Sequence, residues 1–200
     1  MSRVVVLDHG SGNLRSVERA LQRAGADVEV TADLDAARAA SGVVVPGVGA
    51  FAACMAALRE AGGADLVRER LSAQRPVLGI CVGMQVLFER GTEHGVTTEG
   101  IGVLPGEVTR LQADVVPHTG WNTVTVPAGS ALFAGLAGEH FYFVHSYAAH
   151  DVPGALTTVT EHGEAFAAAV ELGALSATQF HPEKSGDAGA ALLVNWLRSL

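Results

Sequence analysis

Short apolar runs alternate with helical patterns through the first half of this 200-residue chain, and this alternation restricts the possible folds more than any other feature. Four such runs predict buried strands, over residues 4–7, 28–30, 43–45 and 77–80. Apolar residues at helical spacing predict four helices between and after them, over residues 14–24, 33–40, 50–60 and 65–71. Strands that alternate with helices imply right-handed crossovers and a parallel sheet with helices on both faces.

The second half has a different character. From about residue 100 to residue 177, apolar segments are separated by Pro and Gly and show little helical periodicity. Four of these segments predict strands of hairpins or short antiparallel additions, over residues 124–126, 140–144, 156–160 and 166–170. An amphipathic helix is predicted over 188–200. We therefore expect an α/β fold with a mixed, mostly parallel sheet, flanking helices and antiparallel additions in the second half.

Length and composition favour one domain over residues 1–200, since two smaller domains would each bury a poor core. A formal charge of −8 without a Lys/Arg stripe argues against nucleic-acid binding. No apolar run reaches the roughly 18 residues of a membrane span, and the first apolar run is too short for a signal peptide. The two cysteines, Cys54 and Cys81, do not form a disulfide framework, so we expect a cytoplasmic protein with reduced thiols.

Cys81 carries the sharpest local signal, within Leu78-Gly-Ile-Cys-Val-Gly-Met-Gln85. An apolar strand runs into the cysteine, Gly83 follows, and a helical stretch is predicted over 84–89, which is the layout of a nucleophile elbow. A sulfur at a helix N-terminus is favoured as the thiolate, and the N–H of Val82 would face a developing oxyanion. The alternative is an inert buried cysteine beside a glycine used for packing.

A base for this cysteine is suggested by Ala177-Thr-Gln-Phe-His-Pro-Glu-Lys184. A strand is predicted to end at His181, and Pro182 stiffens the connection to Glu183. A carboxylate held in this way can fix the imidazole tautomer and stabilise the imidazolium. The alternative is a surface histidine with an accidental acidic neighbour. No His/Cys/Asp/Glu cluster has metal-ligand spacing, so neither a metal nor a cofactor is expected.

Two glycine-rich turns and the second cysteine complete the candidate features. The turn in Val45-Pro-Gly-Val-Gly-Ala-Phe51 can aim backbone N–H groups at an oxyanion, but it is too short for a phosphate-binding P-loop. The loop over residues 8–13 has Gly-x-Gly without the third glycine of a dinucleotide fingerprint. Cys54 lies in an apolar, Ala-rich helical pattern, which favours a buried structural thiol.

Taken together, these segments resemble the triad-type (class I) glutamine amidotransferases, in which Gly-x-Cys-x-Gly and a distant His-Pro-Glu mark the catalytic triad. Three further segments, Asp8-His-Gly-Ser-Gly-Asn-Leu14, Pro117-His-Thr-Gly-Trp-Asn122 and Tyr142-Phe-Val-His-Ser-Tyr147, narrow the resemblance to the glutaminase subunits of imidazole glycerol phosphate synthase. The likeness covers essentially the whole chain and implies a three-layer amidotransferase fold. It departs at His9, where Tyr is common, and at Val82, where Leu is common.

The resemblance implies a glutaminase in which Cys81 attacks the side-chain amide of glutamine, His181 transfers the proton and Glu183 orients His181. Ammonia leaves, and water then hydrolyses the γ-glutamyl thioester. The oxyanion would be held by the backbone N–H of Val82 and by one from the turn of Val48 and Gly49. Glutamine would be held by Gly49, Gln85, His145, Ser146 and Tyr147.

The resemblance also implies a partner, the cyclase subunit, which is a (β/α)8 barrel that forms a heterodimer with the glutaminase and receives ammonia through a channel. The cyclase makes imidazole glycerol phosphate and an aminoimidazole carboxamide ribotide. The positions expected to face it are Asn13, Trp121, Asn122, Tyr142 and Lys184. Aromatic residues are enriched at interface cores, whereas the alternative for Trp121 and Tyr142 is ordinary core packing.

Three rival functions remain open on the sequence. One is a glutaminase of the same class that serves another synthase, such as one for pyridoxal phosphate, anthranilate or guanylate. Another is a regulatory subunit that keeps the fold but not the chemistry, although Cys81, His181 and Glu183 are all present. The third is a stand-alone thiol hydrolase acting on another amide or ester, which would turn over fully without a partner.

Overall fold

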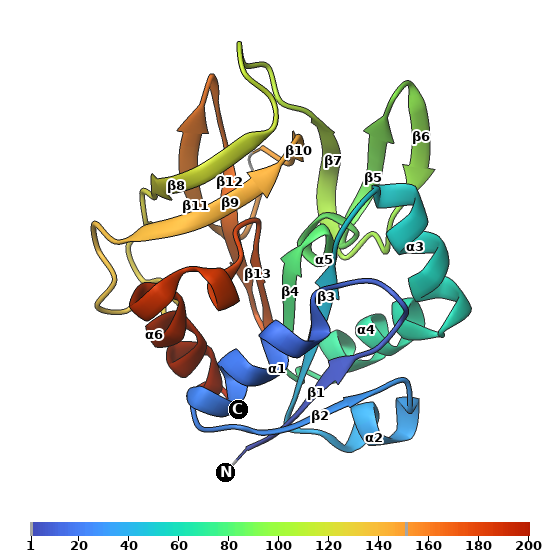
Figure 1. The fold of residues 1–200 in the computed structure, drawn as a ribbon. Coiled ribbons are helices and arrows are strands. Elements are labelled where there is room, and N and C mark those ends of the chain that lie inside the picture. Colours follow the sequence, from blue (N-terminus) through green and yellow to red (C-terminus); the bar gives the residue numbers. More distant parts are fainter. Residues whose placement is uncertain (1, 151) are drawn as a thin grey trace.

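The structure is a computed structural model that describes residues 2–150 and 152–200, and among these the main sheet has seven strands (Figure 1). Its parallel strands are β1 (Arg3–Leu7), β2 (Asp27–Thr31), β3 (Gly42–Gly47), β4 (Val77–Cys81) and β13 (Leu175–Thr178). At one edge, β12 (Glu164–Leu172) and β11 (Leu156–His162) continue the sheet as antiparallel strands. The strand order is β11-β12-β13-β4-β3-β1-β2, so the predicted mixed, mostly parallel sheet is confirmed.

Helices cover the sheet on both sides (Figure 1). They are α1 (Leu14–Arg23), α2 (Leu34–Ala39), α3 (Phe51–Glu60), α4 (Gly63–Ser72) and α6 (Gly186–Leu197). Helix α1 packs with α6, while α4 packs with α2 and α3. Every residue of β3 and β4 is buried, and a strand buried on both faces requires a helical layer on each side. Within the described part, no helix is long and apolar enough to cross a membrane.

The second half adds two smaller sheets (Figure 1). One has the order β10-β7-β5-β6, formed by β5 (Phe88–Glu93), β6 (Val96–Glu99), β7 (Leu104–Arg110) and β10 (Tyr147–Ala148). The other pairs β8 (His118–Thr123) with β9 (His140–His145) as an antiparallel ribbon. The antiparallel additions predicted for the second half are therefore present.

Two local predictions were wrong. The helical stretch predicted over 84–89 is a single turn, α5 (Val82–Gln85), followed directly by β5. The helix cannot continue because the carbonyls of residues 86–88 accept hydrogen bonds from the backbone amides of residues 101–104. The strand predicted over 124–126 is only an isolated bridge between Thr125 and Val159, because the pairing with β9 is made upstream, by residues 118–123.

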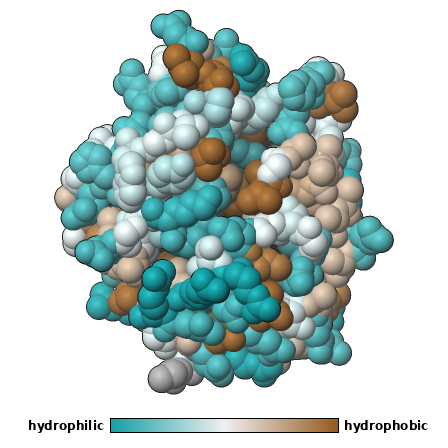
Figure 2. Space-filling model, viewed as in Figure 1, coloured by the Kyte–Doolittle hydropathy of each residue, from teal (hydrophilic) through white to brown (hydrophobic). Residues whose placement is uncertain are grey.

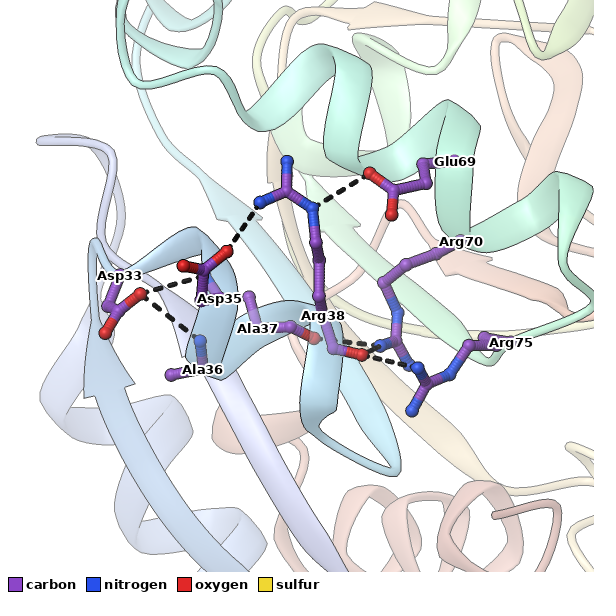
Figure 3. Close-up of polar contacts among 8 residues, drawn as sticks. All are labelled: Asp33, Asp35, Ala36, Ala37, Arg38, Glu69, Arg70 and Arg75. Atoms are coloured by element: carbon purple, nitrogen blue, oxygen red, sulfur yellow. Dashed lines mark hydrogen bonds and ion pairs between the residues drawn. The ribbon is translucent and has the colours of Figure 1, made fainter.

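Two arginines close the C-terminal end of α2 (Figure 3). Arg70 of α4 is 1% exposed, and its guanidinium donates at 2.9–3.1 Å to backbone carbonyls, those of Ala37, Ala40, Ser41 and Pro76. Arg75 adds a bond to the carbonyl of Ala40 at 2.9 Å. The last carbonyls of a helix have no intrahelical partners, and a cation there also complements the helix dipole. Burial, and after it the neighbouring Arg75, lower the pKa of Arg70 to about 10, so it remains charged at neutral pH.

Replacing Arg70 by methionine should lower the free energy of unfolding by about 3 kcal/mol, because it leaves several buried carbonyls without donors. Urea unfolding followed by circular dichroism measures this loss. The matched control is Arg15→Met, since Arg15 is largely exposed and forms a surface ion pair with Glu18. That variant should change stability by no more than about 0.5 kcal/mol. Equal losses in both variants would mean that the guanidinium of Arg70 does not stabilise this corner of the fold.

Candidate active site

Cys81 lies at the end of β4 on a strained turn into α5. Its φ of 57° and ψ of −115° are rare for a residue with a side chain. The turn also requires glycine beside it, because a Cβ at Gly83 would lie 1.9 Å from the carbonyl oxygen of Val45. The predicted strand-to-helix turn at the cysteine is therefore present. The predicted helix-dipole effect is small, however, because α5 has only four residues and few aligned peptide dipoles.

His181 is held rigidly next to this turn. Its backbone N–H donates to the carbonyl of Tyr142 at 3.0 Å, and Ser185 Oγ donates to its carbonyl at 2.7 Å. Pro182 begins a short 3-10 helix, η1 (Pro182–Lys184), which brings Glu183 back to the imidazole. His181 Nδ1 donates to Glu183 Oε1 at 2.8 Å, and the two side chains are only 4% and 1% exposed. This is a buried, oriented imidazole rather than a surface histidine.

The charge state of His181 follows from its neighbours. Burial alone would lower its pKa, but hydrogen bonds to Cys81 and Glu183 and the charges of both groups raise the pKa to about 9. His181 is therefore an imidazolium at neutral pH. Cys54 differs, since its burial raises the pKa of its thiol to about 12. Cys54 is 1% exposed, as predicted for a structural thiol.

A cavity of about 240 Å³ brings the predicted site residues together. The cavity is lined by Cys81 and His181 and by every position expected to hold the oxyanion or glutamine, which are Val48, Gly49, Val82, Gln85, His145, Ser146 and Tyr147. Glu183 stands behind His181, and Lys184 reaches the cavity from the predicted partner face. The cavity also has Glu93 in its wall, which the sequence did not indicate, because Glu93 ends the unpredicted strand β5.

His145 enters the cavity wall as a neutral ring. Its Nδ1 donates to the carbonyl of Tyr147 at 2.9 Å, which leaves Nε2 to accept a hydrogen bond from His118 Nδ1 at 3.2 Å. Burial lowers the pKa of His145 to about 3 and that of His118 to about 4. Both rings are therefore uncharged at neutral pH. The role of His118, which supports His145 from β8, was not predicted from the sequence.

The glycine-rich turn after β3 borders the cavity near Cys81. Gly49 has a φ of 82°, which favours glycine, and Val48 is 42% exposed. The N–H of Val48 is directed to Ser11 Oγ at 3.4 Å, so its donor is already engaged. Ser11 Oγ in turn donates to the carbonyl of Val48 at 3.1 Å. The loop over residues 8–13 thus braces this turn.

The β8–β9 ribbon presents aromatic surface next to the cavity. Trp121 is 57% exposed, which rules out ordinary core packing, and its ring lies edge-on to Tyr142 with the centroids 5.9 Å apart. Lys184 Nζ lies 5.9 Å from the centre of the Tyr142 ring. Asn122 donates to the carbonyl of Glu161 at 3.0 Å. Asn13 stands at the start of α1 without a side-chain capping bond.

Figure 2 shows separate hydrophobic patches on this face, near its centre and at its upper margins, among a largely hydrophilic surface. Among residues 2–150 and 152–200, no three His, Cys, Asp or Glu side chains come together in a way that could hold a metal ion. The groups at the cavity include a thiol, an imidazole, a carboxylate and backbone donors.

This fold recurs in known proteins. Residues 5–200 match the family described as glutamine amidotransferase class-I, and the chain belongs to that family. A solved glutamine amidotransferase has a TM-score of 0.77 at 22% identity, covering 96% of this chain and 98% of that chain. The structure titled PurLQS from Thermotoga maritima has a TM-score of 0.72 at 19% identity, covering 99% of both chains. At such identities the likeness concerns the fold alone.

Curated relatives with similar sequences indicate which subgroup of the class I amidotransferases includes this chain. The imidazole glycerol phosphate synthase subunit HisH of Mycobacterium leprae is 65% identical over 201 residues, covering 98% of both chains. The subunit of the same name from Streptomyces avermitilis is 62% identical over 208 residues, covering 99% of this chain and 97% of the relative. Within the class I amidotransferases, the chain belongs to the family of these HisH subunits.

Proposed function

We propose that this chain is the glutaminase subunit of imidazole glycerol phosphate synthase and releases ammonia from glutamine for histidine biosynthesis. The observation that carries the proposal is the meeting of three groups at one cavity. Cys81 stands on a strained turn, His181 is next to it, and the carboxylate of Glu183 is buried 2.8 Å from His181 Nδ1. Its relatives at 62–65% identity carry the name of that subunit.

The reaction follows from these positions. The Cys81 thiolate attacks the side-chain amide carbon of glutamine, and the oxyanion is stabilised by the N–H groups of Val82 and Gly49. Gly49 replaces Val48 as the donor from this turn, because the N–H of Val48 is directed to Ser11. His181 gives its proton to the departing nitrogen, so the C–N bond breaks and ammonia leaves. A γ-glutamyl thioester remains on Cys81.

Hydrolysis then restores the enzyme. His181, now neutral, takes a proton from water as the oxygen attacks the thioester carbon, and the C–S bond breaks to give glutamate and the Cys81 thiolate. Glu183 holds His181 in one orientation through both steps. Substrate glutamine is held by the remaining cavity residues, Gly49, Gln85, His145, Ser146 and Tyr147.

We infer that the partner is a cyclase subunit with a (β/α)8 barrel fold, which forms a heterodimer with this chain and receives ammonia through a channel. Free ammonia is mostly protonated at neutral pH and is then not nucleophilic, so enclosed transfer preserves its reactivity. The proposed contact surface consists of Asn13, Trp121, Asn122, Tyr142 and Lys184. Its support is the exposure of Trp121 and the position of Lys184, which lines the cavity and has its Nζ 5.9 Å from the centre of the Tyr142 ring.

Replacing Trp121 by alanine should raise the Kd for the cyclase subunit about 30-fold or more, because exposed tryptophans that become buried in an interface are typical hot spots. Isothermal titration calorimetry with the two purified subunits measures this change. The matched control is Leu172→Ala. Leu172 is also exposed, but it pairs with Leu175 at the end of the sheet opposite Cys81. An equal effect of both substitutions, or none of Trp121→Ala, would contradict the proposed surface.

Glutamate release from glutamine, with and without the cyclase subunit and its ligand, tests the proposed function. We expect release that the cyclase stimulates. Release that is stimulated instead by a different synthase would favour a glutaminase of the same class with another partner. Full turnover without any partner, together with hydrolysis of other amides or esters, would favour a stand-alone thiol hydrolase.

A further inference from the structure

A line of buried amide groups runs from Gln85 in the cavity wall through Gln179 to Cys81. Gln179, between β13 and His181, is fully buried, and its Nε2 lies 3.8 Å from Cys81 Sγ. Its Oε1 accepts a hydrogen bond from Gln85 Nε2 at 2.9 Å. Gln85 Nε2 also donates to the backbone carbonyl of Tyr147 at 2.9 Å. The backbone N–H of Gln179 is held as well, by the carbonyl of Ala168 at 2.8 Å.

These contacts determine which end of the Gln179 amide faces the sulfur. A backbone carbonyl can only accept, so the end of Gln85 that faces Tyr147 must be its NH2 group. The same NH2 group faces Gln179, whose nearer atom must therefore be the oxygen. The NH2 group of Gln179 is consequently directed at Cys81 Sγ. The orientation thus depends on one unambiguous acceptor and not on a free choice between the two ends of an amide.

We propose that Gln179 is a further catalytic residue, a locked N–H donor that stabilises the Cys81 sulfur as a thiolate, with Gln85 as the positioning residue that holds it. A side-chain NH2 group offers donors and no acceptor, so it stabilises a thiolate and not a thiol. Its stabilisation of the sulfur's negative charge adds to that of the His181 imidazolium on the cavity side. It also supplies part of the stabilisation that the dipole of the short helix α5 cannot provide.

The proposal rests on the glutaminase chemistry proposed above and deepens it at both steps. In the first step, the donor keeps the sulfur ionised before glutamine binds. In the second step, the sulfur leaves as a thiolate when water cleaves the thioester, and the same donor stabilises the charge that develops as the C–S bond breaks. Gln179 contacts the sulfur from behind the cavity wall, so its contribution should appear in kcat more than in the KM for glutamine.

This role can be tested without substrate or partner by measuring how the alkylation of Cys81 by iodoacetamide depends on pH. Peptide mass spectrometry identifies the alkylated cysteine. Gln179→Met keeps the length of the side chain and removes the donor. We expect it to slow the alkylation of Cys81 at neutral pH about tenfold, because the ionised sulfur loses a hydrogen-bond donor. With the cyclase present, kcat for glutamate release should fall about tenfold while KM stays within about twofold. An unchanged alkylation profile would overturn the proposal.

Two further variants sharpen the test. Thr178→Val alters a fully buried neighbour whose hydroxyl donates only to the carbonyl of Phe180, and it should leave the alkylation profile unchanged. Gln85→Met keeps Gln179 but frees its amide, and it should slow the alkylation of Cys81 by a smaller factor. If Gln179→Met does not fold, the alkylation profile of Gln85→Met tests the proposal instead. An unchanged profile in that variant also overturns the proposal. Failure of the glutaminase itself would appear separately, as glutamate release that survives Cys81→Ala.

Discussion

Replacing Cys81 by alanine should reduce partner-stimulated glutamate release about 10⁴-fold or more, because the thioester route then has no nucleophile. The fold should persist, since alanine only removes a sulfur atom from the wall of an existing cavity. A coupled assay for glutamate, run with saturating cyclase subunit, measures the loss. Binding of the cyclase should remain, and calorimetry checks that the variant is correctly folded.

The second cysteine provides the matched control. Cys54 is buried in α3, and its thiol has a pKa of about 12, so it is neutral at working pH. Cys54→Ala should therefore keep kcat within about twofold, with a modest loss of stability from the small cavity. A parent-like Cys81→Ala variant would refute the nucleophile assignment. A Cys54→Ala variant as inactive as Cys81→Ala would point to a structural cause for both losses.

Replacing Glu183 by glutamine should lower kcat about 10³–10⁴-fold, since the amide can present its NH2 group to His181 and select the wrong tautomer. The pH profile should change as well. Burial lowers the pKa of His181, while Cys81 and Glu183 together raise it to about 9. Removing the charge of Glu183 removes part of the raising effect, so the pKa must fall. The alkaline limb of the profile should therefore move to lower pH.

Steady-state rates across the pH range, with saturating glutamine and cyclase, measure both effects. The control is Glu171→Gln, because Glu171 is a carboxylate that accepts hydrogen bonds from the backbone of Ala131 and Leu132 and does not line the cavity described above. That change should affect stability without moving the alkaline limb. If Glu183→Gln kept both kcat and the position of the limb, His181 would not depend on this carboxylate.

The parallel half of the fold could be predicted because its signals are strong. The strands β1, β3 and β4 are buried on both faces and appear in the sequence as continuous apolar runs. The smaller sheets lack this signal. Strand β8 has the sequence His-Thr-Gly-Trp-Asn-Thr and β6 has Val-Thr-Thr-Glu, so both depend on backbone pairing rather than on apolar periodicity. The error over 84–89 has the same origin, because distant backbone amides bind the carbonyls that a helix would use.

The triad could be proposed from sequence because its two motifs together resemble those of the class I amidotransferases, although each motif alone left a structural alternative open. What joins them is the parallel pairing of β13 with β4, in which Thr178 lies opposite Ile80. That pairing places the carboxyl ends of two neighbouring strands together, where sites in α/β folds form. Gln179 and His118 had no such signal, because their roles depend on partners far along the chain. Gln179 contacts Gln85 across 94 positions, and His118 contacts His145 across 27.

The most direct measurement is the mass of the cysteine peptides after acid quenching during glutamine turnover with the cyclase subunit present. We expect a γ-glutamyl adduct on the peptide that contains Cys81, with the Cys54 peptide unmodified. The adduct should be absent without glutamine and after the substrate is exhausted. An adduct on Cys54, or rapid turnover with no adduct on Cys81 at any quench time, would contradict covalent catalysis by Cys81.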